Sequence, residues 1–98
     1  MPLWIRKPQE QPGTYQFSGT FFVTLGVAAT LTPDEITAIY LDIQLFVAET
    51  GGIDYLQIYI SETGDKLYFI DHCTKEMMED PQFEEGQNYC TLLFAHEY

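Results

Sequence analysis

The clearest hydrophobic pattern in this 98-residue chain is a helical one. It starts at Thr32-Pro33-Asp34-Glu35, where a threonine N-cap, a proline in the first helical position and a glutamate three residues after the cap form a capping box. Gly51 and Gly52 end it, and the first is suited to a left-handed C-terminal position. The sequence therefore predicts one helix between Thr32 and Gly51. Its apolar stripe has spacings of three and four and comprises Ile36, Ile39, Tyr40, Ile43, Phe46 and Val47.

Four other segments have the β-branched, aromatic and alternating pattern of strands. They are Tyr15–Val27, Ile53–Ser61, Lys66–Cys73 and Tyr89–Ala95. A tight connection over 62–65 predicts that the second and third form a hairpin. Residues 74–88 are expected to be a loop with one helical turn at Lys75–Glu79. The order β-α-β-β-β predicts an α+β fold, a two-layer sandwich in which one helix packs on a mostly antiparallel four-stranded sheet.

The first fourteen residues differ in composition from the rest, because Pro2, Pro8, Pro12 and Gly13 lie there among polar residues. We therefore expect an N-terminal arm over 1–14 and a single α+β domain over 15–98, a size that supports one core. Trp4 and Ile5 are the residues of the arm that are able to dock onto the domain.

The net charge limits which partners the chain can bind. It is −11 at pH 7, and residues 34–98 alone carry −12, because fourteen of the fifteen acidic residues lie there with two lysines. Such a field attracts basic protein surfaces and repels nucleic acid and anionic lipid. The chain also has no apolar run of membrane-spanning length, and its start has no signal-peptide core. We expect a cytoplasmic protein with no membrane contact and no direct nucleic-acid binding.

Two groups of residues are candidates for binding a protein partner. The first is acidic and lies in the loop 74–88: Glu76, Glu79, Asp80, Glu84 and Glu85. It is either a docking surface for a basic partner or a solvated loop. The second is aromatic and comprises Tyr55, Tyr59 and Tyr68. If Leu56, Ile58 and Ile60 face the helix, these tyrosines lie on the opposite face of the sheet, where a partner, a second copy or the N-terminal arm covers them.

The residue types of a metal or catalytic site are present but poorly spaced. His72 and Cys73 are adjacent in a strand and point to opposite faces, so they cannot easily join Cys90 and His96 around one zinc ion. A triad of Cys90, His72 and Asp71 lacks the nearby cation or helix N-terminus that activates a thiol. The sequence predicts reduced cysteines, no metal, no cofactor and no catalytic residue, and hence a protein that is not an enzyme.

Short motifs near both ends of the domain resemble those of a known group of proteins. They are Phe22-Val23-Thr24-Leu25-Gly26-Val27, Phe69-Ile70-Asp71 and the closing Leu92-Leu93-Phe94-Ala95-His96-Glu97-Tyr98. The chain resembles an uncharacterised family of small proteins encoded on bacterial plasmids and mobile elements, whose members end in a leucine-rich strand plus Ala-x-Glu-Tyr. That family has a Gly-Glu-His-Asp-type segment after the helix, where this chain has residues 49–54 without histidine. The resemblance implies a genomic setting among plasmid-maintenance and anti-restriction genes.

The leading functional hypothesis is a non-enzymatic, acidic interaction protein that binds a basic protein surface. An inhibitor of a nucleic-acid-binding defence enzyme fits this description, because clustered carboxylates can occupy a groove built for phosphates. The alternative is a structural or regulatory homodimer that buries the tyrosine-rich sheet face. A small enzyme that uses Cys90, His72 or His96 is a third class. Association with a basic partner should weaken with salt, whereas an apolar dimer should not.

Overall fold

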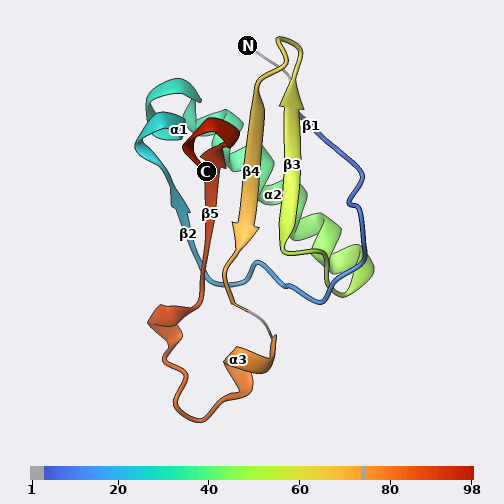
Figure 1. Cartoon of the computed structure of the whole chain (residues 1–98), viewed down its shortest axis with the longest axis vertical. Coiled ribbons are helices and arrows are strands. Elements are labelled where there is room, and N and C mark those ends of the chain that lie inside the picture. The colour runs from blue at the N-terminus through green and yellow to red at the C-terminus, as the bar shows by residue number, and fades with distance from the viewer. Residues whose placement is uncertain (1–3, 74) are drawn as a thin grey trace.

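A computed structural model of the chain describes residues 4–73 and 75–98, without the side chains of Lys75 and Glu85. Five strands and three α-helices follow one another along the chain (Figure 1). Their order is β1 (Trp4–Arg6), β2 (Thr20–Val23), α1 (Leu25–Thr30), α2 (Pro33–Thr50), β3 (Leu56–Ser61), β4 (Lys66–Asp71), α3 (Lys75–Glu79) and β5 (Tyr89–Phe94). Short 3-10 helices, η1 (Glu85–Gln87) and η2 (Ala95–Glu97), precede and follow β5.

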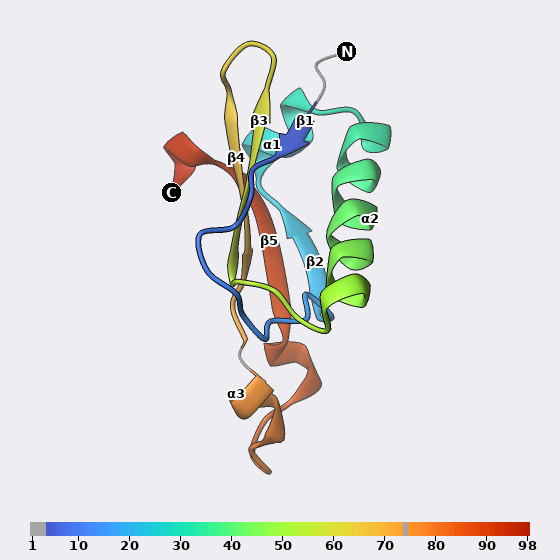
Figure 2. The ribbon, with the colours of Figure 1, turned by 90° about the vertical axis from the view of Figure 1, so that its right-hand side faces the viewer.

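The strands form one mixed sheet in the order β1-β3-β4-β5-β2. All neighbouring pairs are antiparallel except β2 and β5, which run parallel. Helix α2 covers one face, while the chain after β1 and the C-terminal end lie on the other side (Figure 2). The predicted α+β class is therefore confirmed. The sheet is mostly antiparallel, as predicted, and α3 occupies the predicted helical turn. The predicted number of strands and the single packed helix are wrong in detail, because β1 and α1 are also present and β2 pairs parallel with β5.

The caps of α2 are those that its sequence predicts. The Thr32 hydroxyl accepts a hydrogen bond from the Glu35 backbone N–H at 3.1 Å, and the Glu35 carboxylate accepts one from the Thr32 N–H at 2.9 Å. The N–H bond from Thr32 lowers the pKa of Glu35. Gly51 ends the helix with φ 79°, a left-handed conformation that glycine adopts without strain. The predicted stripe faces the sheet, with Ile39, Ile43 and Val47 buried in the core.

The first predicted strand, Tyr15–Val27, is shorter than expected and becomes a helix at its C-terminal end. Tyr15 makes an isolated bridge to Ile53, and the regular strand β2 begins at Thr20. Between them Phe17 has φ 50°, so the extended backbone is interrupted there. Its N–H donates to the buried Asp71 carboxylate at 2.9 Å. Thr24 then caps α1 by accepting a hydrogen bond from the Val27 N–H.

The fifth strand, β1, lies in the segment that was expected to be an N-terminal arm. β1 pairs antiparallel with β3, with Ile5 opposite Ile60. The Trp4 indole donates to the Glu35 carboxylate at 3.1 Å, and its ring packs on the core. Proline-rich surroundings conceal a strand of only three residues from pattern analysis, and this strand is one edge of the sheet.

The predicted orientation of β3 is wrong. Gln57, Tyr59 and Ser61 face α2 and are buried, whereas Leu56, Ile58 and Ile60 point to the opposite face and are half-buried. Tyr59 is 2 % exposed and belongs to the core. Alternation alone could not identify the inner face, since both sets contain apolar or aromatic residues.

A polar contact with the helix explains this orientation. The Tyr59 hydroxyl donates to the Asp42 carboxylate of α2 at 2.7 Å, and the same oxygen accepts from Arg6 Nε at 2.9 Å. The Arg6 guanidinium also lies 3.9 Å from the centre of the Phe46 ring. Burial, followed by the bond to Asp42, raises the pKa of Tyr59 well above its usual value, so the phenol remains a donor. One carboxylate thus joins β1, α2 and β3.

We predict that Tyr59→Phe lowers the free energy of unfolding by about 1–2 kcal/mol, because it removes a hydrogen bond to an ionised acceptor. Tyr55→Phe is the matched control, since Tyr55 is partly exposed outside the core. Urea denaturation of both variants measures the effect. Equal stability of the two variants would show that the Tyr59–Asp42 bond does not hold the helix on the sheet.

Candidate interaction site

The acidic residues between β4 and β5 lie on a part of the chain that projects from the sheet. Residues 75–88, here called the acidic projection, leave the end of β4 and return to the start of β5 (Figures 1 and 2). They include the predicted helical turn α3, with the predicted bounds Lys75–Glu79. The backbones of all five predicted acidic residues lie on this projection. The side chains of Glu76, Glu79, Asp80 and Glu84 are exposed, and that of Glu85 lies outside the described part of the structure.

The fold makes little use of these carboxylates. Backbone hydrogen bonds shape the projection, from Asp80 to Met77 and from Phe83 to Asp80. The Asp80 carboxylate accepts a bond from the Gln82 N–H at 2.8 Å and so shapes the turn. Those of Glu76, Glu79 and Glu84 form no hydrogen bond or ion pair with another described side chain. Their charges are therefore exposed to solvent and accessible to a binding partner.

The three predicted tyrosines do not form one surface. Tyr59 is buried under α2, as described above. Tyr55 precedes β3 and lies beside Tyr15, with 5.9 Å between ring centres. Tyr68 lies on the face of the sheet that points away from α2. Its ring packs edge-on against that of Tyr98, with 5.7 Å between the ring centres. Only Tyr68 occupies the face on which all three were expected.

The sheet face that points away from α2, here called the open face, is nonetheless apolar. None of its described strand positions carries a carboxylate, and Lys66 is its charged residue. Phe22 is 52 % exposed at one edge and Ile5 is exposed at the other. The strand residues of this face are Ile5, Thr20, Phe22, Leu56, Ile58, Ile60, Lys66, Tyr68, Ile70, Tyr89, Thr91 and Leu93.

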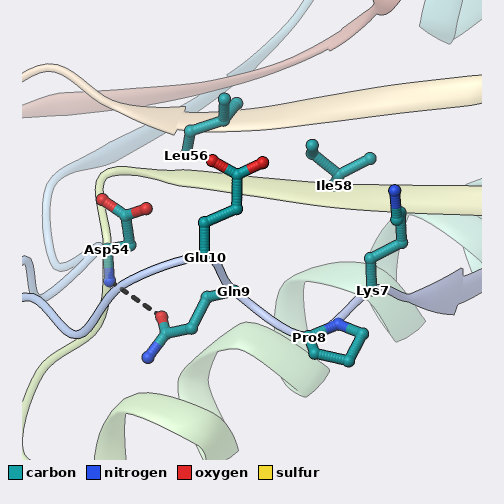
Figure 3. Close-up of a pocket in the computed structure, with 7 residues that line it drawn as sticks. All are labelled: Lys7, Pro8, Gln9, Glu10, Asp54, Leu56 and Ile58. Carbon is teal, nitrogen blue, oxygen red and sulfur yellow. Dashed lines mark hydrogen bonds between the residues drawn. The ribbon is translucent and has the colours of Figure 1, made fainter.

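A recess of about 80 Å³ lies on the open face, where the chain after β1 passes β3 (Figure 3). Leu56 and Ile58 form its apolar floor, and Glu10 stands over them (Figure 3). Asp54 lies at one end and Lys7 at the other, so the recess contains two carboxylates and one ammonium group.

The residues around Asp54 are held in place by amide groups. The Asp54 N–H and the Gln57 side-chain amide both donate to the Gln9 side-chain oxygen, at 3.0 and 3.1 Å. The Gln57 amide also donates to the Asp54 carbonyl at 3.0 Å. Within its carboxylate, Asp54 Oδ1 accepts from the Tyr55 N–H at 2.8 Å. Oδ2 accepts no hydrogen bond from a described residue, although Asp54 is only 8 % exposed.

The cysteines and histidines lie apart. Cys90 is buried on the α2 side opposite Asp71, whereas His72 is exposed and stacks on Tyr89, so the triad of Cys90, His72 and Asp71 does not assemble. Burial, with a smaller effect of Asp71, raises the pKa of Cys90 to about 12, which keeps the thiol protonated. Cys73 is also buried and forms no disulfide, and its thiol donates to the Gln87 carbonyl at 2.7 Å. Among the described residues, no three His, Cys, Asp or Glu side chains are placed to hold a metal ion.

Sequence patterns did not identify the recess or Phe22 as surface features. The recess exists because the chain after β1 crosses the end of β3, and nothing in the sequence of Lys7–Glu10 indicates that crossing. Alternation along β2 places Phe22 on the face opposite to Phe21 and Val23, but the sequence does not show which of these two faces α2 covers.

Comparison of this chain with protein-family models, curated proteins and solved structures finds no match. Among the helices that the structure describes, none has the length and apolar character needed to cross a bilayer.

Proposed function

We propose that this protein is a non-enzymatic interaction protein whose acidic projection binds a basic surface of another protein. The observation that carries the proposal is the position of the exposed carboxylates on residues 75–88, beyond the end of the sheet (Figure 1). The carboxylates of Glu76, Glu79 and Glu84 form no hydrogen bond or ion pair with a described residue. Concentrating like charges on a protruding segment raises the rate at which an oppositely charged partner is captured.

The rest of the molecule supports a binding role over a catalytic one. The Cys90 thiol is buried with a raised pKa, and the described histidines lie away from it. A basic groove that normally holds nucleic-acid phosphates is one surface that exposed carboxylates complement. Inhibition of a nucleic-acid-binding defence enzyme in the cytoplasm is therefore the more specific form of the proposal. It agrees with the genomic setting that the family resemblance implies.

The test removes three of the five acidic charges of the projection and keeps Asp80, whose carboxylate shapes the turn. We predict that the triple variant Glu76→Gln, Glu79→Gln and Glu84→Gln retains the wild-type melting temperature or slightly exceeds it, because it relieves like-charge repulsion. It should capture basic host proteins far less than the wild type does at low salt. Quantitative mass spectrometry of proteins retained on the immobilised variants, at low and high salt, measures the difference.

A matched control removes three charges elsewhere, with Asp34→Asn, Glu49→Gln and Asp65→Asn. This control should keep a basic protein that the projection variant loses, and high salt should release that protein from both control and wild type. If the two triple variants lose the same proteins equally, net charge alone is responsible. The projection is then not the binding element.

The open face favours a second candidate function, a structural or regulatory homodimer. Five strands about 4.8 Å apart make a face about 19 Å wide. Ile5, Phe22 and Tyr89 are its exposed apolar or aromatic residues, and exposed apolar surface of this kind is often functional. Two sheets with the same twist can pack face to face, and the described strand positions of the open face carry no carboxylate that would repel its copy. In this candidate Phe22, Tyr68 and Leu93 occupy the interface, and Tyr59 does not.

Sedimentation equilibrium tests the dimer. The account predicts a dimer that tightens as salt screens the −11 charge of each copy, and a lower association constant for Phe22→Ser. Leu45→Ser is the matched control, because Leu45 is 64 % exposed on α2, on the other side of the sheet. A wild-type protein that stays monomeric at all salt concentrations excludes this candidate. Dissociation by Leu45→Ser alone would place the interface on α2.

A further inference from the structure

We propose that the recess beside β3 binds an arginine side chain of the basic partner. The inference rests on the proposed function, which it extends by giving the partner a specific residue and the protein a specific place to receive it. Its basis is the pairing of an apolar floor with two carboxylates in a recess on the open face (Figure 3).

The floor matches the aliphatic part of such a side chain. Leu56 and Ile58 are both half-buried, so apolar surface remains accessible between them and the chain at Pro8 and Glu10. The three methylene groups of an arginine cover apolar surface while its charged end reaches a polar group. A short polar ligand would leave this floor in contact with water.

The carboxylates match the charged end. Asp54 is held by the surrounding amides and has one oxygen that accepts no hydrogen bond from a described residue, even though little of the residue reaches solvent. This oxygen is not among the side-chain atoms that are both shielded from solvent and unpaired, so a donor that enters the recess can reach it and form a charge-assisted hydrogen bond. The planar guanidinium has five donors and can serve Asp54 and Glu10 together, which an ammonium point charge does less well.

The protein's own Lys7 lines the opposite end of the recess and is a competitor. Its ammonium reduces the negative potential that a guanidinium would meet. Removing this charge should therefore strengthen binding, whereas removing either carboxylate should weaken it. A general effect of net charge would give the same two signs. Both variants are therefore compared with a variant that changes the charge outside the recess.

The experiment uses the full chain and a probe that needs no partner. N-acetyl-arginine methylamide is titrated into the protein while methyl signals of Leu56 and Ile58 are followed by NMR. The citrulline analogue, which has the same shape without the charge, is the control probe. We expect saturable shifts at these two methyl groups with the arginine probe and none with the citrulline probe, and no shift at the distant Leu45.

The variants then assign the binding to the two carboxylates. Asp54→Asn should weaken binding about tenfold, the effect of losing one charge-assisted hydrogen bond. Glu10→Gln should weaken it severalfold, Lys7→Gln should strengthen it, and Glu49→Gln, which makes the same charge change on α2, should leave it unchanged. Because Glu10 and Lys7 are exposed, their variants keep the test valid even if Asp54→Asn fails to fold.

The proposal is overturned if the arginine probe produces no saturable shift at Leu56 and Ile58. Equal shifts with the citrulline analogue, or equal weakening by Glu49→Gln and Glu10→Gln, would also overturn it. Failure of the proposed function is separable from these outcomes. Neutralising Glu76, Glu79 and Glu84 tests the acidic projection, and it should leave the affinity of the recess for the probe nearly unchanged.

Discussion

The carboxylate of Asp42 is the contact on which the arrangement of this protein depends. It accepts hydrogen bonds from Tyr59 on β3 and from Arg6 on β1, and it belongs to the single long helix that covers the sheet. This contact determines which face of β3 is covered and holds the edge strand β1 against the helix. The opposite face is then left to the chain after β1 and to η2. Both the open face and the recess result from this orientation of β3.

Acidic residues serve two different purposes in this molecule. Some are part of its construction: Asp42 joins three elements, Glu35 caps α2, and Asp71 accepts bonds from the backbone of Phe17 and Cys73. Glu97 similarly accepts from the Phe94 N–H and from Thr24, and the bond from Phe94 lowers its pKa. On the acidic projection, the Asp80 carboxylate shapes a turn, whereas those of Glu76, Glu79 and Glu84 accept no hydrogen bond from a described residue. This division is why we place the binding function on the projection.

Local sequence rules predicted the features that are determined locally. The capping box at Thr32, the left-handed glycine at position 51, the hairpin of β3 and β4 and the turn α3 all depend on neighbouring residues. Features that depend on distant contacts were missed or wrong. The inner face of β3 depends on Asp42, seventeen residues away from Tyr59, and the recess depends on the passage of Lys7–Glu10 past β3. The predicted acidic residues were therefore placed together by one short segment, whereas the predicted tyrosines were separated by the tertiary fold.

The central claim is that the acidic projection binds and the remainder of the domain supports it. β4 and β5 are adjacent antiparallel strands, with Asp71 opposite Cys90, so a two-residue Asn-Gly turn can replace residues 75–86. The decisive measurement is the affinity of this shortened protein for the basic protein that the wild type captures, with its NMR amide spectrum confirming the fold. The account predicts an intact sheet and α2 with the affinity lost. An intact fold that binds the same protein with wild-type affinity would contradict it.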